Sequence, residues 1–114
     1  MHELSIALSL VDLAQEEAGR QGGRVCAVHL RIGALAGVVP AALVASYEMA
    51  AFRTPLEGSR LVIEEVPVVV FCPTCQVQRV LEGVQSFCCP ECATPTPQVD
   101  RGRELELVAL EIES

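Results

Sequence analysis

Four cysteines in two C-P-x-C pairs constrain this 114-residue chain more than any other feature of its sequence. Cys72 and Cys75 form the first pair, Cys89 and Cys92 form the second, and thirteen residues separate the two pairs. The two-residue gap lets both sulfurs of a pair converge, and Zn²⁺ prefers four thiolates at about 2.3 Å in tetrahedral geometry. The spacing therefore predicts a structural zinc site in a small zinc-ribbon-like module.

Other uses of four cysteines fit this pattern less well. A redox-active C-x-x-C motif normally begins a helix in a thioredoxin-like fold, which two symmetric pairs do not suggest. Disulfides are rare in a reducing cytosol, where we expect this protein. An iron–sulfur cluster also binds four thiolates and stays the alternative to zinc.

Two further cysteines lie outside the pairs. Cys88 directly precedes Cys89. The C-P-x-C repeat favours Cys89 as the zinc ligand and leaves Cys88 as a spare thiol near the site, although Cys88 as a substitute ligand stays open. Cys26 alternates with Val28 and Leu30 in an apolar stretch, so we expect it to be a buried thiol of the core.

Hydropathy and charge narrow the class of protein. No apolar run reaches the roughly 20 residues of a membrane span, and Leu4–Ala18 lacks the pattern of a signal peptide, so we expect a cytoplasmic protein without a membrane partner. The net charge is −7, and Arg79 is the one basic residue between Cys72 and Cys92. Because nucleic-acid binding needs a basic surface, the sequence argues against a nucleic-acid partner.

Hydrophobic periodicity predicts alternating helices and strands ahead of and behind the cysteine module. The expected elements are helices over Leu4–Gly19 and Pro40–Arg53 and strands over Val25–Ile32, Arg60–Val66 and Glu104–Glu113. In the last strand the apolar positions change parity between Leu107 and Val108. This change indicates a bulge, or burial on both faces of the strand.

The N-terminus offers several nitrogen donors close together. The α-amine of Met1, a deprotonated backbone amide and the imidazole of His2 form a set of the kind that selects Ni²⁺ or Cu²⁺. Glu3 adds a carboxylate or its own backbone amide. A histidine at a chain end is more often a disordered terminal residue, but here the predicted helix begins at Leu4 and restricts the terminus. On these residues alone, both interpretations of His2 stay open.

Three stretches together resemble a known family. They are "MHELSIA" at the start, "HLRIGALAGVVP" in the first half, and the cysteine module followed by "LELVALEIE". In this order they resemble the hydrogenase maturation nickel metallochaperones of the HypA/HybF family, and the resemblance covers essentially the whole chain. It implies a protein that is not an enzyme. Such a protein carries Ni(II) to the precursor of the [NiFe] hydrogenase large subunit with a nickel-insertion GTPase as partner, and some relatives serve urease.

The resemblance also implies a fold and a set of ligands. It implies an α+β fold in which a small mixed β-sheet is flanked by two helices, with the nickel domain over residues 1–66 plus 101–114 and an inserted zinc domain over residues 67–100. The implied nickel ligands are His2, the α-amine of Met1 and the backbone amide of Glu3. The implied ligands of a structural Zn(II) are Cys72, Cys75, Cys89 and Cys92. The oligomeric state stays open between a monomer and a weak homodimer.

Besides the extra Cys88, this chain departs from the family pattern in two places. Ala93 follows Cys92 where many relatives have glycine, so we expect a strained second knuckle. Residues 33–45 contain no acidic side chain, so a nickel ligand from this loop is a backbone group or is absent. The competing hypothesis is a zinc-ribbon adaptor that binds other proteins and has no nickel role.

Overall fold

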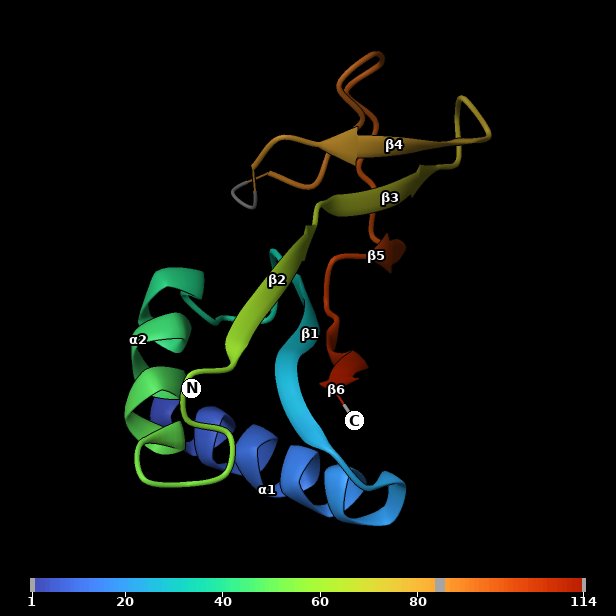
Figure 1. The fold of residues 1–114 in the computed structure, drawn as a ribbon. Helices are drawn as coiled ribbons and strands as arrows, with labels where there is room; N and C mark the ends of the chain where they lie inside the picture. Colours follow the sequence, from blue (N-terminus) through green and yellow to red (C-terminus); the bar gives the residue numbers. More distant parts are fainter. Residues whose placement is uncertain (1, 84–85, 114) are drawn as a thin grey trace. The chain divides into compact units, whose positions relative to one another are not determined.

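A computed structural model describes residues 2–83 and 86–113 of the chain (Figure 1). The chain folds as two compact units. The first consists of Met1–Arg31, Val38–Glu64 and Glu106–Ser114, and the second consists of Ile32–Gly37 and Glu65–Leu105. No helix among the described residues has the length and apolarity that crossing a membrane requires.

Two helices and three strands build the first unit. They are α1 (Glu3–Gln21), β1 (Arg24–Gly33), α2 (Pro40–Ala51), β2 (Arg60–Val66) and β6 (Leu105–Glu113), and the sheet order is β2-β1-β6. These elements match the predicted ones to within about two residues at each end, the usual uncertainty of an element boundary. The predicted α+β class, with two helices and a small sheet, is confirmed.

The central strand β1 has a parallel neighbour and an antiparallel one. It leads through α2 to β2, and both strands run the same way along the sheet (Figure 1), as a helical crossover connection requires. On its other side β6 returns in the opposite direction, and the side chains of His29 and Glu111 face each other across these two strands. The sheet is therefore mixed.

Helix α1 buries one narrow face. Its buried residues are Ala7, Leu10, Val11 and Ala14. Leu4, Leu8 and Leu13 are 41%, 49% and 48% exposed. Part of the apolar surface of α1 is therefore exposed. The helix ends at Gly22, whose positive φ of 71° suits glycine and whose N–H donates to the Ala18 carbonyl.

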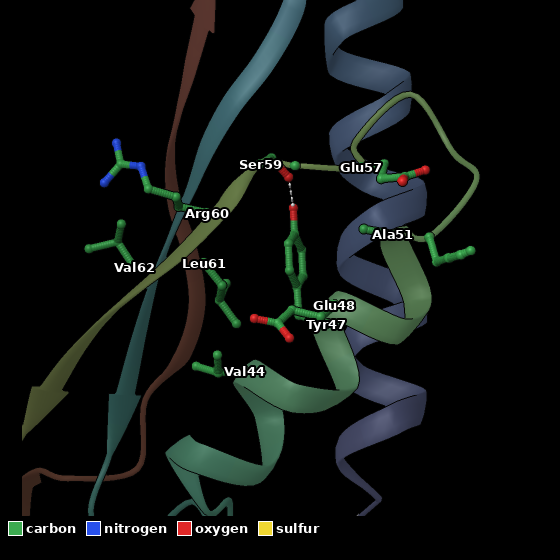
Figure 2. Close-up of a pocket in the computed structure, with 11 residues that line it drawn as sticks. Val44, Tyr47, Glu48, Ala51, Glu57, Ser59, Arg60, Leu61 and Val62 are labelled. Carbon is green, nitrogen blue, oxygen red and sulfur yellow. Dashed lines mark hydrogen bonds between the residues drawn. The ribbon is translucent and has the colours of Figure 1, made fainter.

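Helix α2 begins with Pro40, which suits the first turn because it has no N–H to satisfy. Leu43, Tyr47 and Ala51 follow at four-residue spacing and are buried against the rest of the unit. Tyr47 crosses a pocket of about 730 Å³ between α2 and the start of β2, and its hydroxyl lies 2.6 Å from the Ser59 hydroxyl (Figure 2). The pocket lining includes no histidine or cysteine.

Strand β1 changes phase in its middle. Ala27 and Val28 are consecutive and both buried, so strict alternation breaks between them. The buried positions are odd-numbered up to Ala27 and even-numbered from Val28 to Ile32. Cys26 consequently shares a face with His29, is half-buried, and lies with its sulfur 3.2 Å from a Glu113 carboxylate oxygen. The prediction of a buried core thiol at Cys26 is wrong for this reason.

Strand β6 shows the phase change that its sequence indicates. Leu107 and Leu110 are half-buried, and the two residues between them, Val108 and Ala109, are both exposed. Val108 therefore does not share the covered face with Leu110, although their spacing suggests that it does. The phase changes in β1 and β6 let both neighbouring strands keep apolar residues on the covered face of the sheet.

The second unit is built on a three-stranded antiparallel sheet. Its strands are β3 (Val68–Cys72), β4 (Val77–Leu81) and β5 (Val99–Arg101), in the order β4-β3-β5. Val68, Val70 and Leu81 form its core, and Leu35 packs against them. The N–H of Leu35 donates to the Gly102 carbonyl at 2.7 Å, which attaches the segment Ile32–Gly37 to this unit.

Candidate metal centres

The four paired cysteines converge in the second unit. The sulfurs of Cys72, Cys75, Cys89 and Cys92 all lie within 4.8 Å of one another. The Cys72–Cys92, Cys75–Cys92 and Cys75–Cys89 separations are 3.5, 3.6 and 4.0 Å. Four sulfurs at about 2.3 Å from one tetrahedral ion lie about 3.8 Å apart. The donor set and its spacing therefore fit a single tetrahedral metal ion.

Two turns with the same backbone hydrogen bond position these sulfurs. In the first, the N–H of Gln76 donates to the Cys72 carbonyl at 2.7 Å, and in the second the N–H of Ala93 donates to the Cys89 carbonyl at 2.8 Å. Gln76 and Ala93 both adopt left-handed backbone, with φ of 58° and 63°. A side chain at such a position is strained, which is the feature expected at Ala93. The C-P-x-C repeat is thus also a repeat of structure.

Hydrogen bonds from the turns reach the sulfurs. The N–H of Cys75 donates to the Cys72 sulfur at 3.3 Å. The Cys92 sulfur lies 3.1 Å from the Thr94 hydroxyl oxygen, which lies 2.9 Å from that of Thr74 in the other turn. The contact between Thr94 and Thr74 connects the two turns. The N–H donor directed at the Cys72 sulfur favours the thiolate form that binds metal.

The environment divides the thiols into two kinds. Burial raises the pKa of Cys89, but N–H groups of Cys92 and Glu91 aimed at its sulfur outweigh burial and bring the pKa to about 6. The Thr94 hydroxyl and N–H lower the pKa of Cys92. Arg79 lowers the pKa of Cys75, but the neighbouring cysteines and burial raise it, to about 11 in total. The cluster therefore holds two thiols with a lowered pKa, Cys89 and Cys92, beside one with a raised pKa, Cys75.

Cys88 lies outside the converging group, although it precedes one of its members. It is half-buried, and its backbone forms an isolated bridge with Pro95. Among the described residues, only the four cysteines of the two pairs form a group of metal-binding side chains with this spacing. The structure thus brings together the set that the C-P-x-C repeat predicts, and Cys88 faces elsewhere.

His2 lies at the start of α1. It is exposed, occupies the N-cap position, and its imidazole makes no capping hydrogen bond. Its carbonyl accepts the N–H of Ile6 at 3.3 Å, so the backbone of His2 is fixed by the first helical turn while its ring stays available. Met1, whose α-amine is a predicted ligand, lies outside the described residues.

Glu3 connects the first turn of α1 to the residue before α2. Its carboxylate accepts the N–H of Val39 at 3.3 Å. This hydrogen bond and one from its own backbone N–H lower the pKa of Glu3 below the usual 4.5. The Glu3 N–H lies in the first turn, where amides have no backbone acceptor within the helix, and its own carboxylate accepts it instead. Val39 was not a predicted site residue, and no sequence signal marks it.

The second histidine has a different environment. The Nε2 atom of His29 lies 2.6 Å from a carboxylate oxygen of Glu111 on the neighbouring strand. His29 is the main cause of the lowered pKa of Glu111. Arg60 also approaches Glu111, at 3.7 Å. His29 thus belongs to a polar network on the sheet with Glu111 and Arg60.

Comparisons with known proteins agree on one family. The family model described as "Hydrogenase/urease nickel incorporation, metallochaperone, hypA" matches residues 1–112. "Hydrogenase maturation factor HypA" from Chloroflexus aurantiacus is 57% identical over 112 residues, which cover 97% of this chain and 98% of that protein. The protein of the same name from Roseiflexus sp. is 50% identical over 114 residues, covering 99% of this chain and 93% of that protein.

Solved structures show the same fold. The solution structure of the Ni metallochaperone HypA from Helicobacter pylori matches with a TM-score of 0.66 and 23% identity, over 98% of this chain and 97% of that one. A second solution structure of a HypA protein matches with a TM-score of 0.71 and 23% identity, over 99% and 97% of the two chains. At this identity the likeness supports the fold and nothing finer.

Proposed function

The chain belongs to the HypA family of nickel-incorporation metallochaperones, and on this premise we propose that it binds Ni(II) at its N-terminus and delivers it to the precursor of the [NiFe] hydrogenase large subunit. The observation that carries the proposal is the exposed His2 at the N-cap of α1, with an imidazole that the helix does not use. A metal-binding group that is held in place but has no structural task suits a protein that must load and release an ion.

The proposed nickel ligands are nitrogens of the first three residues. They are the imidazole of His2, the α-amine of Met1 and the backbone amide of Glu3. Nitrogen donors in tetragonal or square-planar geometry suit Ni²⁺. The Glu3 carboxylate is engaged with Val39, which favours the amide of Glu3 over its side chain as the ligand.

The position of this site favours release. The N-terminus of a helix carries partial positive charge, which repels a bound cation. The proposed ligands come from three consecutive residues, and the His2 side chain among them is exposed. We expect an ion held in this way not to be enclosed by the protein. We therefore expect a nickel site that a stronger acceptor can empty.

We propose that the four-cysteine cluster holds Zn(II) and that its role is structural. Its sulfurs come from two separate turns, so one ion joins segments that are distant in the sequence. In a zinc site of this kind, binding the ion supplies folding free energy, and a site with four protein ligands has no open position for transfer. The resident zinc and the cargo nickel are then held by different kinds of site.

The proposed partners follow the same premise. They are a nickel-insertion GTPase and the precursor of the [NiFe] hydrogenase large subunit. The chain itself performs no catalysis and acts in the cytoplasm, as a monomer or a weak homodimer. The exposed leucines of α1 support the second possibility, because they offer apolar surface to another copy of the chain.

Equilibrium dialysis of zinc-loaded protein against Ni²⁺ tests the proposal. We expect one tightly bound Ni²⁺ per chain, with zinc retained. A chain with two residues added before Met1 keeps every side chain but moves the α-amine, and we expect it to bind nickel more weakly. A zinc-ribbon adaptor takes up no stoichiometric nickel, and that result would reject the proposed function.

A further inference from the structure

Arg79 lies next to the four-cysteine cluster and is the one basic side chain between Cys72 and Cys92. It belongs to β4 and pairs with Val70 of β3. Directly opposed residues of an antiparallel pair point to the same face, and so do residues two apart on one strand. The side chain of Arg79 is therefore on the face of the sheet that also carries Val70 and Cys72.

Arg79 is half-buried, and the position of its Nε atom requires an explanation. Its Nε atom is buried and has no hydrogen-bond partner within the part of the chain that the structure describes. Removing a cationic group from water is costly unless negative charge lies nearby. Arg79 interacts most strongly with the sulfurs of Cys75 and Cys89, and this interaction raises the pKa of Arg79. Both sulfurs become thiolates when they bind a metal ion.

We propose that Arg79 is a built-in counter-charge of the metal centre, which stabilises the four-thiolate complex through the sulfurs of Cys75 and Cys89. This inference rests on the proposed zinc site. Four thiolates bring more negative charge than a divalent cation neutralises, so the loaded centre stays anionic. The two acidic side chains between Cys72 and Cys92, those of Glu82 and Glu91, add to this excess.

Arginine suits this role better than lysine. Its guanidinium is planar, stays charged at every accessible pH, and presents donors in a fixed fork, so it can face two sulfurs at once. Cys75 and Cys89 come from different turns, and their sulfurs lie 4.0 Å apart. Arg79 therefore joins one ligand of each pair. It acts as a positioning residue, because it touches the ligands and not the ion.

Zinc affinity of charge variants tests the inference. Arg79→Gln removes the charge and Arg79→Lys keeps it without the fork. Arg103→Gln is the matched control, since it removes the charge of an exposed arginine of the same unit outside the cysteine turns. We expect Arg79→Gln to raise the Kd for Zn²⁺ roughly 10–100-fold in competition with a chromophoric chelator, the range typical of residues that support metal ligands. The Kd of Arg79→Lys should lie between those of the parent and Arg79→Gln, and the Kd of Arg103→Gln should equal that of the parent.

A spectrum separates weakened binding from failed folding. At saturating Co²⁺ we expect the parent and both Arg79 variants to show the same four-sulfur tetrahedral absorption, because all four ligands survive. Unchanged zinc affinity in Arg79→Gln overturns the inference. Equal losses of zinc affinity in Arg79→Gln and Arg79→Lys also overturn the inference, since they would show that the shape of the arginine side chain matters and its charge does not. A parent protein that fails to give the four-sulfur spectrum overturns the zinc site itself, and the inference with it.

Discussion

The backbone N–H of Val39 donates a hydrogen bond to the carboxylate of Glu3 over 3.3 Å. Val39 is the N-cap of α2 and Glu3 is the first residue of α1. This contact therefore joins the starts of the two helices beside His2. It also explains how a loop without acidic side chains can help to order the proposed nickel site, because the loop contributes a backbone donor.

The Glu3–Val39 contact should be lost in acid. The hydrogen bond from Val39 is the largest cause of the lowered pKa of Glu3, so the folded carboxylate stays ionised below the usual 4.5. A lowered folded pKa means that the contact stabilises the fold above 4.5 and is lost as the pH falls through the folded value. An NMR titration of the Val39 amide should show a midpoint below 4.5 that is absent in Glu3→Gln. A midpoint at or above 4.5 would contradict the contact.

Replacing Ala93 by glycine should stabilise the second unit. Ala93 has a φ of 63°, where a non-glycine residue is strained. We expect Ala93→Gly to raise the free energy of unfolding of the zinc-loaded protein by about 0.5–1 kcal/mol. Ala45→Gly, at an exposed position in the interior of α2, should lower it by about 1 kcal/mol. Denaturant unfolding measures both, and a loss of stability in Ala93→Gly would show that the turn tolerates alanine.

The adjacent cysteines 88 and 89 should respond differently to substitution. The Cys89 sulfur belongs to the converging group and that of Cys88 does not. Cys89→Ser should therefore weaken zinc binding strongly, whereas Cys88→Ser should leave it nearly intact. Chelator competition gives both affinities. The reverse ranking would place the ligand at Cys88, and two mild effects would mean that one thiol replaces the other.

The metal-free cluster should react unevenly with alkylating reagents. Cys92 is exposed and Thr94 lowers its pKa, whereas the pKa of Cys75 is raised to about 11. Because the thiolate is the nucleophile, iodoacetamide near neutral pH should modify Cys92 well before Cys75. Cys26, whose pKa is raised mainly by Glu113, is an internal reference for a slow thiol. Peptide mass spectrometry gives the order, and faster modification of Cys75 would refute it.

Much of the fold could be predicted from local sequence patterns. Pro40 marked the start of α2, and the segment Arg60–Val66, with the consecutive apolar residues Leu61–Ile63, indicated the limits of β2, because both signals are local. The phase change at Ala27 in β1 has no such signal, since it depends on how neighbouring strands pair. Leu35 lies in a stretch of small residues that reads as a loop, and its packing on the second unit comes from contacts distant in the sequence.

The sites were predictable to different degrees. The cysteine set followed from its spacing, because the two-residue gap sets the turn that orients both sulfurs. Arg79 could not be assigned from the sequence, since the pairing of β3 with β4 brings it to the cluster. Val39 was equally hidden, because it contributes a backbone N–H that any residue except proline carries.

The number of nickel ions bound by histidine variants tests the central claim most directly. The chain has two histidines, and they make a matched pair: His2 is exposed at the helix start, and His29 is bound to Glu111. The two variants, His2→Ala and His29→Ala, are loaded with zinc and dialysed to equilibrium against Ni²⁺. We expect His2→Ala to bind no Ni²⁺ tightly and His29→Ala to bind one Ni²⁺ per chain, with zinc retained in both. Undiminished nickel binding by His2→Ala would contradict nickel binding at the N-terminus.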